Sequence, residues 1–227
     1  MSGPKKTVFI ATPAYDEWVC IEYASSLFES GAYLASCGIG MHHAVAPGNP
    51  FLDMARNKLV ASFLSTDATD LLFIDADVGW DAKALTRVLS HPQQIVGGLV
   101  PKRDAKRDDS YHMNALTGVM SSNGLFEAQE IPTAFLRIKR SALERLQAAG
   151  IGTEERPFFK IGNAVGEFGE DIYFCRRWCE TGERLWIDSD ITFTHRGGKV
   201  WRGNFFEHCV KTGVLVQPET SPVSLAA

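Results

Sequence analysis

Two carboxylates, Asp75 and Asp77, directly follow the apolar run 71–74. Such a run is typical of a buried strand, and in open α/β sheets ligands bind beyond the carboxyl ends of the strands. Two carboxylates at that place can hold a hard divalent cation together with the sugar end of a nucleotide diphosphate. The alternative is a pair of solvated acidic residues that open a turn, with Asp77 or Asp81 as a helix cap.

A second acidic pair, Glu170 and Asp171, follows Gly169 at a predicted helix start. A carboxylate within reach of an acceptor hydroxyl can act as its general base. Acidic residues in the first turn also complement the helix dipole, and this pattern by itself favours that structural interpretation.

His195 follows the predicted short strand 191–194 and precedes the segment 196–199, Arg-Gly-Gly-Lys. A neutral imidazole can complete a metal site, and the glycines would let the backbone approach a phosphate. Arg196 and Lys199 can pair with phosphate or simply be solvated. A single histidine after a strand is more often structural.

Two further features carry open alternatives. The charged segment 102–107 can hold a diphosphate or a charged acceptor, although a solvated loop is favoured. Trp80 and Trp201 can wall a sugar pocket or cover the sheet.

The elements that must position these residues follow from hydrophobic periodicity. In the first hundred residues we expect strands at 7–12, 39–45, 71–74 and 95–100, and helices at 17–36, 51–64 and 82–89. This alternation predicts an α/β fold with a mainly parallel, doubly wound central sheet flanked by helices.

The second half is less regular. We expect a hairpin of 116–120 and 125–129 around the turn 122–124, strands at 135–138, 185–187 and 191–194, and helices at 141–149 and 171–181. Ser141 and Glu144 match a capping box at the start of the helix 141–149.

Composition limits the broad class. A chain of 227 residues with 45% hydrophobic residues can bury a core, and a net charge of −4 gives no long-range attraction to polyanions. The five cysteines show no framework spacing, so we expect reduced thiols. No signal peptide or membrane-length apolar run is present in the sequence, and we expect a cytoplasmic protein without an integral membrane segment.

Four segments in this order resemble the family 2 type of GT-A glycosyltransferase: Pro13–Glu17, Phe73–Asp77, Gly169–Asp171 and Thr194–His195. The resemblance spans about residues 8–199. The segment 135–143 is similar to the one before the acceptor-side helix in such enzymes. Arg56 and Asn57, with the DxD-containing strand, are similar to the fungal mannan polymerase type of GT-A enzyme.

The resemblance implies a single GT-A-like catalytic domain over 1–216, with a nucleotide-sugar half at about 7–100, an acceptor half at about 101–216 and a flexible tail at 217–227. The chain has no room for the extra acceptor domains or membrane helices of polymerising relatives.

The implied activity is a metal-dependent transfer of sugar, with inversion, from a UDP- or GDP-sugar to an acceptor hydroxyl. The acceptor would be a glycan, a lipid, a protein or a modified nucleic-acid base. The alternatives are a nucleotidyltransferase and a catalytically inactive nucleotide- or carbohydrate-binding module. Against the former, the segment after the first strand lacks the Gly-rich basic loop that such enzymes carry.

The resemblance also assigns roles to single residues. Asp77 would bind Mn²⁺ or Mg²⁺ with His195 as the further protein contact, and an imidazole ligand favours Mn²⁺. Asp171 would be the base and Glu170 an acceptor-side contact. The donor would be held by Pro13, Tyr15, Glu17, Arg56, Asp75 and Lys199; of these, Tyr15 would stack on the base and Asp75 would touch ribose or sugar.

Overall fold

The computed structural model describes residues 6–104, 106, 110–111, 116–120, 124–162 and 169–213. The expected tail 217–227, part of the expected turn 122–124 and most of the charged segment beyond Asp104 lie outside the described residues.

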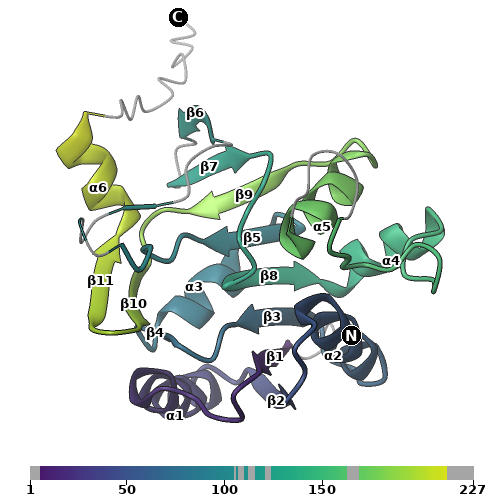
Figure 1. Cartoon of the computed structure of the whole chain (residues 1–227), viewed down its shortest axis with the longest axis horizontal. Helices are drawn as coiled ribbons and strands as arrows, with labels where there is room; N and C mark the ends of the chain where they lie inside the picture. Colours follow the sequence, from purple (N-terminus) through teal and green to yellow (C-terminus); the bar gives the residue numbers. More distant parts are fainter. Residues whose placement is uncertain are drawn as a thin grey trace, which may run out of the picture.

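The main sheet of the described chain has eight strands in the order β2-β1-β3-β8-β5-β9-β7-β6 (Figure 1). All of them run in the same direction except β8 and β7, which are antiparallel to their neighbours. The expected α/β fold with a mainly parallel, helix-flanked sheet is confirmed. The strands are β1 (Thr7–Ala14), β2 (Gly40–Pro47), β3 (Asp70–Ile74), β5 (Ile95–Gly98), β6 (Leu116–Met120), β7 (Leu125–Ala128), β8 (Phe135–Lys139) and β9 (Leu185–Asp188).

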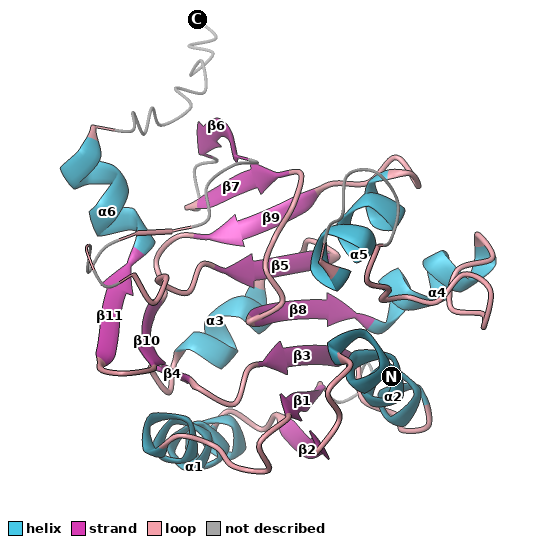
Figure 2. Cartoon of the chain, viewed as in Figure 1, coloured by secondary structure: helices cyan, strands magenta, loops and turns pink. Residues whose placement is uncertain are grey.

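Helices cover both faces of this sheet, as Figure 2 shows. Alternate residues of one strand point to opposite faces, and the core is accordingly split in two. Phe9 and Phe73 belong to one buried cluster, whereas Val8 and Leu72, their neighbours in sequence, belong to the other. The first cluster is covered by α2 (Leu52–Leu64), α4 (Arg140–Ala148), α5 (Glu170–Cys179) and α6 (Phe205–Thr212), and the second by α1 (Ile21–Ser36) and α3 (Ala84–Ser90).

A small antiparallel sheet lies beside the carboxyl ends of the main strands. It consists of β4 (Val78–Trp80), β10 (Thr192–Arg196) and β11 (Val200–Asn204), with β10 in the middle. In this register His195 lies opposite Val78 on one side and opposite Trp201 on the other. The chain therefore passes from the two carboxylates of 75–77 directly into the sheet that carries His195.

The start of the first helix differs from the expectation. The helix begins at Ile21 rather than Glu17, because Glu17 adopts a left-handed conformation with φ of 62°. The backbone N–H of Glu17 bonds to the carbonyl of Ala14 at 3.1 Å and closes a turn after β1. The cap is Cys20, whose Sγ accepts from the backbone N–H of Tyr23 at 3.3 Å.

The capping box expected at Ser141 is wrong. The helix begins one residue earlier, at Arg140, and its cap residue Lys139 makes no side-chain cap bond. The hydroxyl of Ser141 lies instead 2.7 Å from Gln94 Oε1. The short strands β4 and β11 and the helix α6 were not expected either.

A buried carboxylate, Asp188 at the end of β9, fixes α3 to the sheet. It is 1% exposed, and its Oδ2 lies 2.7 Å from both Arg87 Nε and His91 Nε2. Burial alone would raise the pKa of Asp188, but the hydrogen bonds from His91 and Arg87 bring it below the ordinary value. The ionised form is thus the one that stabilises the fold.

Asp188→Ala should lower the free energy of unfolding by about 3–5 kcal/mol at neutral pH, because it leaves Arg87 and His91 without their buried partner. Since the folded pKa is depressed, the contribution is present above the unfolded value and is lost as the pH falls through the folded one. Urea unfolding at several pH values measures both effects. Asp190→Ala is the matched control: Asp190 pairs with Arg87 at 3.2 Å on the surface and should contribute less than about 1 kcal/mol. Equal losses in the two variants would contradict this account.

Candidate functional site

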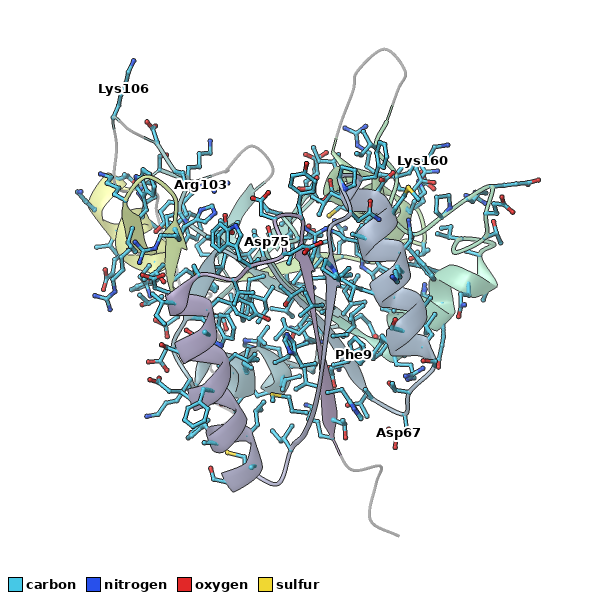
Figure 3. The ribbon with its side chains drawn as sticks, turned by 60° about the horizontal axis from the view of Figure 1, so that its bottom comes forward. Phe9, Asp67, Asp75, Arg103, Lys106 and Lys160 are labelled. Atoms are coloured by element: carbon cyan, nitrogen blue, oxygen red, sulfur yellow. The ribbon has the colours of Figure 1, made fainter. Side chains whose placement is uncertain are left out.

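The candidate residues gather at the carboxyl edge of the main sheet. Asp75 follows the end of β3, and its backbone N–H bonds at 3.1 Å to the carbonyl of Ala134, just before β8. Arg103 comes from the segment after β5, a parallel strand that ends at the same edge. Figure 3 places Asp75 and Arg103 at the same end of the molecule and Asp67 at the opposite end. The topology thus brings both acidic segments of the sequence into one region.

The centre of this region is the buried guanidinium of Arg56, on α2. Arg56 is 1% exposed, and it donates from Nη2 to Asp75 Oδ1 at 3.0 Å and from Nε to Glu170 Oε1 at 3.1 Å. The guanidinium also lies over the ring of Phe73, 5.1 Å from its centroid. One buried cation therefore joins the end of β3 to the start of α5.

Arg56 and Glu170 were expected to contact donor and acceptor, respectively. The structure places both in the interior, with Glu170 8% exposed. Arg56 Nη1 is buried and has no hydrogen-bond partner among the described residues. The pair of Arg56 and Glu170 is placed to hold Asp75 and the start of α5, which carries Asp171, in position.

Asp171 lies beside this ion pair, at the second residue of α5. Its Oδ1 accepts from the backbone N–H of Ile172 at 2.8 Å. Burial raises the pKa of Asp171 above its ordinary value, the charge of Asp75 raises it further, and the charge of Arg56 opposes both. A carboxylate with a raised pKa is a stronger base than an ordinary surface aspartate.

Asp77, two residues beyond Asp75, faces His195. Asp77 Oδ2 lies 3.5 Å from His195 Nε2 and 2.8 Å from Arg103 Nη1. The second ring nitrogen, Nδ1, lies 2.7 Å from the carbonyl oxygen of Pro101 and therefore donates to it. Burial alone would raise the pKa of Asp77, but the hydrogen bond from His195 and the charges of His195 and Arg103 bring it below the ordinary value. Asp77 is thus held as a carboxylate.

These two side chains fit a divalent cation in part. The attraction between His195 and Asp77 belongs to the protonated imidazole. When the ring is neutral, Nδ1 keeps its proton for the carbonyl of Pro101 and the lone pair of Nε2 points towards Asp77, and a carboxylate with an imidazole in that form suits Mn²⁺. Among the described residues, however, no group of three or more His, Cys, Asp or Glu side chains lies close enough to hold a metal by itself. Any ion here would need oxygens from a ligand or from water.

A hollow of about 560 Å³ opens beside this pair. Its lining includes Arg103, His195, Pro132 and Ala134. A larger cavity, about 760 Å³, lies on the opposite face of the small sheet, where Thr192 and Thr194 line it. Trp80 lines the larger cavity, but none of the residues expected to catalyse the reaction or to bind donor or metal does. His195 lines the smaller one, which is therefore the better candidate for a substrate site.

The segment after β1, where a nucleoside was expected, is held in a defined shape. The backbone N–H groups of Glu17 and Gly48 both bond to the carbonyl of Ala14 at 3.1 Å, which ties together the turns after β1 and β2. Pro13 is buried within β1, whereas the ring of Tyr15 is 62% exposed and available for stacking. The left-handed Glu17 is a strained position for a non-glycine residue, and such strain clusters at functional sites.

Several residues of the C-terminal part have partners that the sequence did not reveal. Arg196 pairs with Glu22 of α1, with Nε 3.1 Å from Oε2. The ammonium of Lys199 lies over the ring of Trp201, 5.2 Å from its centroid. Trp80 is 6% exposed and donates to Ser30 Oγ at 2.9 Å, so it covers the sheet.

Arg103 lies at the candidate site, which its position in a charged segment did not predict. The segment 102–107 was favoured as a solvated charge run, yet Arg103 is paired with Asp77. The only signal in the sequence was its position a few residues beyond the apolar run 95–100, which predicts the same sheet edge as Asp75 and Asp77.

Comparison of the sequence with known protein families and with curated proteins finds no match. Among solved structures, the chain is similar to a glycosyltransferase involved in glycosylation of the major capsid of PBCV-1, at 14% identity and a TM-score of 0.38, over 65% of this chain and 68% of that one. It is also similar to S. aureus TarS 1–349 in complex with UDP-GlcNAc, at 11% identity and a TM-score of 0.47, over 80% of this chain and 55% of that one. A third structure is the inositol-1-phosphate CTP transferase from T. maritima, at 9% identity and a TM-score of 0.45, over 86% of this chain and 91% of that one.

These likenesses are distant. No helix in the described part of the chain is long and apolar enough to span a membrane.

Arg56→Met should raise the pKa of Asp171 further, because the charge of Arg56 lowers that pKa in addition to the backbone hydrogen bond from Ile172. It should also lower the free energy of unfolding by about 3–5 kcal/mol, since Glu170 would be buried without a partner. Carboxyl NMR titration, with Asp171→Asn for assignment, gives the pKa, and urea unfolding gives the stability.

Lys58→Met is the control, because it removes the same charge from an exposed position of the same helix. If Arg56→Met does not fold, Arg56→Lys keeps the charge and should leave the pKa of Asp171 close to that of the unmodified protein. An unchanged pKa in the Met variant would contradict the proposed coupling.

Proposed function

We propose that the chain is a glycosyltransferase that moves a sugar from a nucleoside-diphosphate sugar to an acceptor hydroxyl with inversion. The observation that carries the proposal is the arrangement at the sheet edge. Asp171, a carboxylate of raised pKa, is close enough to Asp75 to feel its charge, and Asp77, two residues beyond Asp75, faces His195. One side of this arrangement suits a base, and the other suits the binding of a diphosphate.

The base has a defined task in this reaction. The acceptor oxygen forms a bond to the anomeric carbon, Asp171 takes the hydroxyl proton, and the bond from that carbon to the diphosphate oxygen breaks. Asp75 is held by Arg56 at 3.0 Å, which fixes its second oxygen for contact with the donor sugar or ribose. Glu170, paired with the same arginine, is a positioning residue for Asp75 and Asp171.

Asp77 and His195 would hold Mn²⁺ or Mg²⁺ together with oxygens of the diphosphate. When bound, the ion supplies charge that neutralises the leaving diphosphate. The carbonyl of Pro101 fixes the tautomer of His195 that leaves Nε2 free. Tyr15, exposed beside the tied turns after β1 and β2, would stack on the nucleobase.

We expect nucleotide binding to need the divalent ion. Asp77 and His195 offer too few ligands to hold the ion without the diphosphate oxygens, so ion and nucleotide should bind together. UDP or GDP affinity should fall sharply in excess chelator, as calorimetry would show. Asp77→Asn should weaken Mn²⁺ binding in the presence of nucleotide by about tenfold or more. Asp75→Asn is the control, since Asp75 is already paired with Arg56 and should matter less to the ion. Equal nucleotide affinity with and without chelator would rule out the metal role.

Asp171→Asn should reduce turnover about 10²- to 10⁴-fold and leave donor binding nearly intact, because the amide cannot take a proton in the transition state. The raised pKa adds a second expectation. A carboxyl whose folded pKa is raised costs stability as the pH rises from the unfolded value through the folded one, so the uncharged variant should not be less stable at pH 7.

Turnover and melting temperature of the purified variant test both points. A residue that serves only to start the helix predicts the reverse pattern, a melting point lowered in line with about 1 kcal/mol and normal turnover per folded molecule. That pattern would remove Asp171 from the mechanism.

A further inference from the structure

Two groups converge on one carboxylate oxygen, Asp77 Oδ2. Arg103 Nη1 lies 2.8 Å from it and His195 Nε2 lies 3.5 Å from it. The same Nη1 of Arg103 also donates to the backbone carbonyl of Arg196 at 3.4 Å. The position at which a cation would bridge Asp77 and His195 is thus next to a guanidinium that the chain itself provides.

The placement of Arg103 is built into the surrounding structure. Two residues before it, Pro101 accepts from His195, and one residue after it, the carbonyl of Asp104 accepts from Trp201 Nε1 at 3.0 Å. The methylene groups of Arg103 pack on Gly197, where an added Cβ would lie 2.8 Å from Arg103 Cδ and 2.9 Å from the ring of Trp201. A side chain at position 197 would therefore displace Arg103 or the tryptophan.

The guanidinium is nevertheless free to exchange partners. The side chain of Arg103 is 49% exposed, in contrast to 1% for Arg56, and it lines the hollow beside His195. An exposed ion pair contributes little to stability, so its opening costs little. Arg103 can leave Asp77 without disturbing the core.

We propose that Arg103 is a donor-binding residue with two alternative partners: Asp77 in the absence of donor, and the donor diphosphate in its presence. The inference rests on the proposed function and adds to it a residue that recognises the diphosphate. A planar guanidinium matches two phosphate oxygens at once, which a lysine ammonium does not.

Because Arg103 can pair with either Asp77 or the diphosphate, the affinity for the metal ion depends on whether nucleotide is bound. A divalent cation on Asp77 would face the like charge of Arg103 only a few ångströms away, so the ion alone binds against that repulsion. When a diphosphate arrives, it gives Arg103 a new acceptor and supplies oxygens to the ion. Each ligand therefore strengthens the binding of the other.

The test compares Arg103→Ala with the unmodified protein in two titrations. With Mn²⁺ alone, followed by electron paramagnetic resonance, the variant should bind about two- to fivefold more tightly, because the competing charge is gone. With UDP and GDP at saturating Mn²⁺, followed by calorimetry, it should bind the nucleotide about tenfold or more weakly. A gain in Mn²⁺ affinity together with a loss of nucleotide affinity in the same variant would indicate that Arg103 exchanges Asp77 for the diphosphate.

Three controls sharpen the comparison. Arg103→Lys keeps the charge but lacks the planar guanidinium that can bind two phosphate oxygens, so Mn²⁺ affinity should stay unchanged while UDP affinity falls. Lys106→Ala removes a charge from the same segment at a position that points away from Asp75 (Figure 3) and should change neither affinity. UMP, or GMP where GDP is the ligand bound, lacks the second phosphate, and its affinity should be nearly the same in the Arg103→Ala variant as in the unmodified protein.

The possible failures are distinguishable. If the unmodified protein binds neither UDP nor GDP, the proposed function and the role of Arg103 fall together. If it binds nucleotide and Arg103→Ala binds it equally well, the role of Arg103 is overturned and the proposed function stands. Equal losses for the monophosphate and the diphosphate would overturn it as well, since they indicate a general disturbance of the pocket.

Discussion

The buried guanidinium of Arg56 constrains the whole carboxyl edge of the sheet. A charge that is 1% exposed is tolerated only when carboxylates and hydrogen bonds surround it, and here they come from the end of β3 and the start of α5. Asp75 and Glu170 therefore cannot move independently. Because Asp171 is the next residue of α5, its position and its pKa depend on the same cation. Asp75 and Asp171, the proposed donor contact and the proposed base, are 96 positions apart in sequence and thus depend on one side chain of α2.

Much of the fold could be predicted from the sequence because it depends on local patterns. The apolar run 71–74 and the alternation of apolar residues in the first hundred positions identify strands and helices that the structure contains. The reversed strand β8 could not be predicted, since nothing in the residues 135–139 shows which strands they pair with. The short strands β4 and β11 exist because β10 pairs with both, and this contact is made only after the chain has folded.

The candidate residues, too, were chosen from local patterns. Residue type and position at strand ends indicated Asp75, Asp77 and His195, and position at a predicted helix start indicated Asp171. What the sequence could not give was the partner of each charge. Glu170 has the same residue type and helix position as an acceptor-side carboxylate, but its pairing with Arg56 across 114 positions places it in the interior. Arg103 lies in the segment 102–107, which has the composition of a surface loop. Its contact with Asp77 distinguishes it from the other charged residues of that segment.

The difference in burial between the two arginines explains how one small site can be both rigid and responsive. Arg56 lies in a low-dielectric interior, where removal of a partner leaves an uncompensated charge, so its ion pairs are permanent. Arg103 lies at the mouth of the hollow, where water screens its pair with Asp77 and makes exchange inexpensive. A permanent cation suits the side of the site that carries Asp171, the proposed base, because a base must keep its geometry through a reaction. An exchangeable cation suits the side on which we propose that a diphosphate binds, because that charge would enter and leave in every cycle.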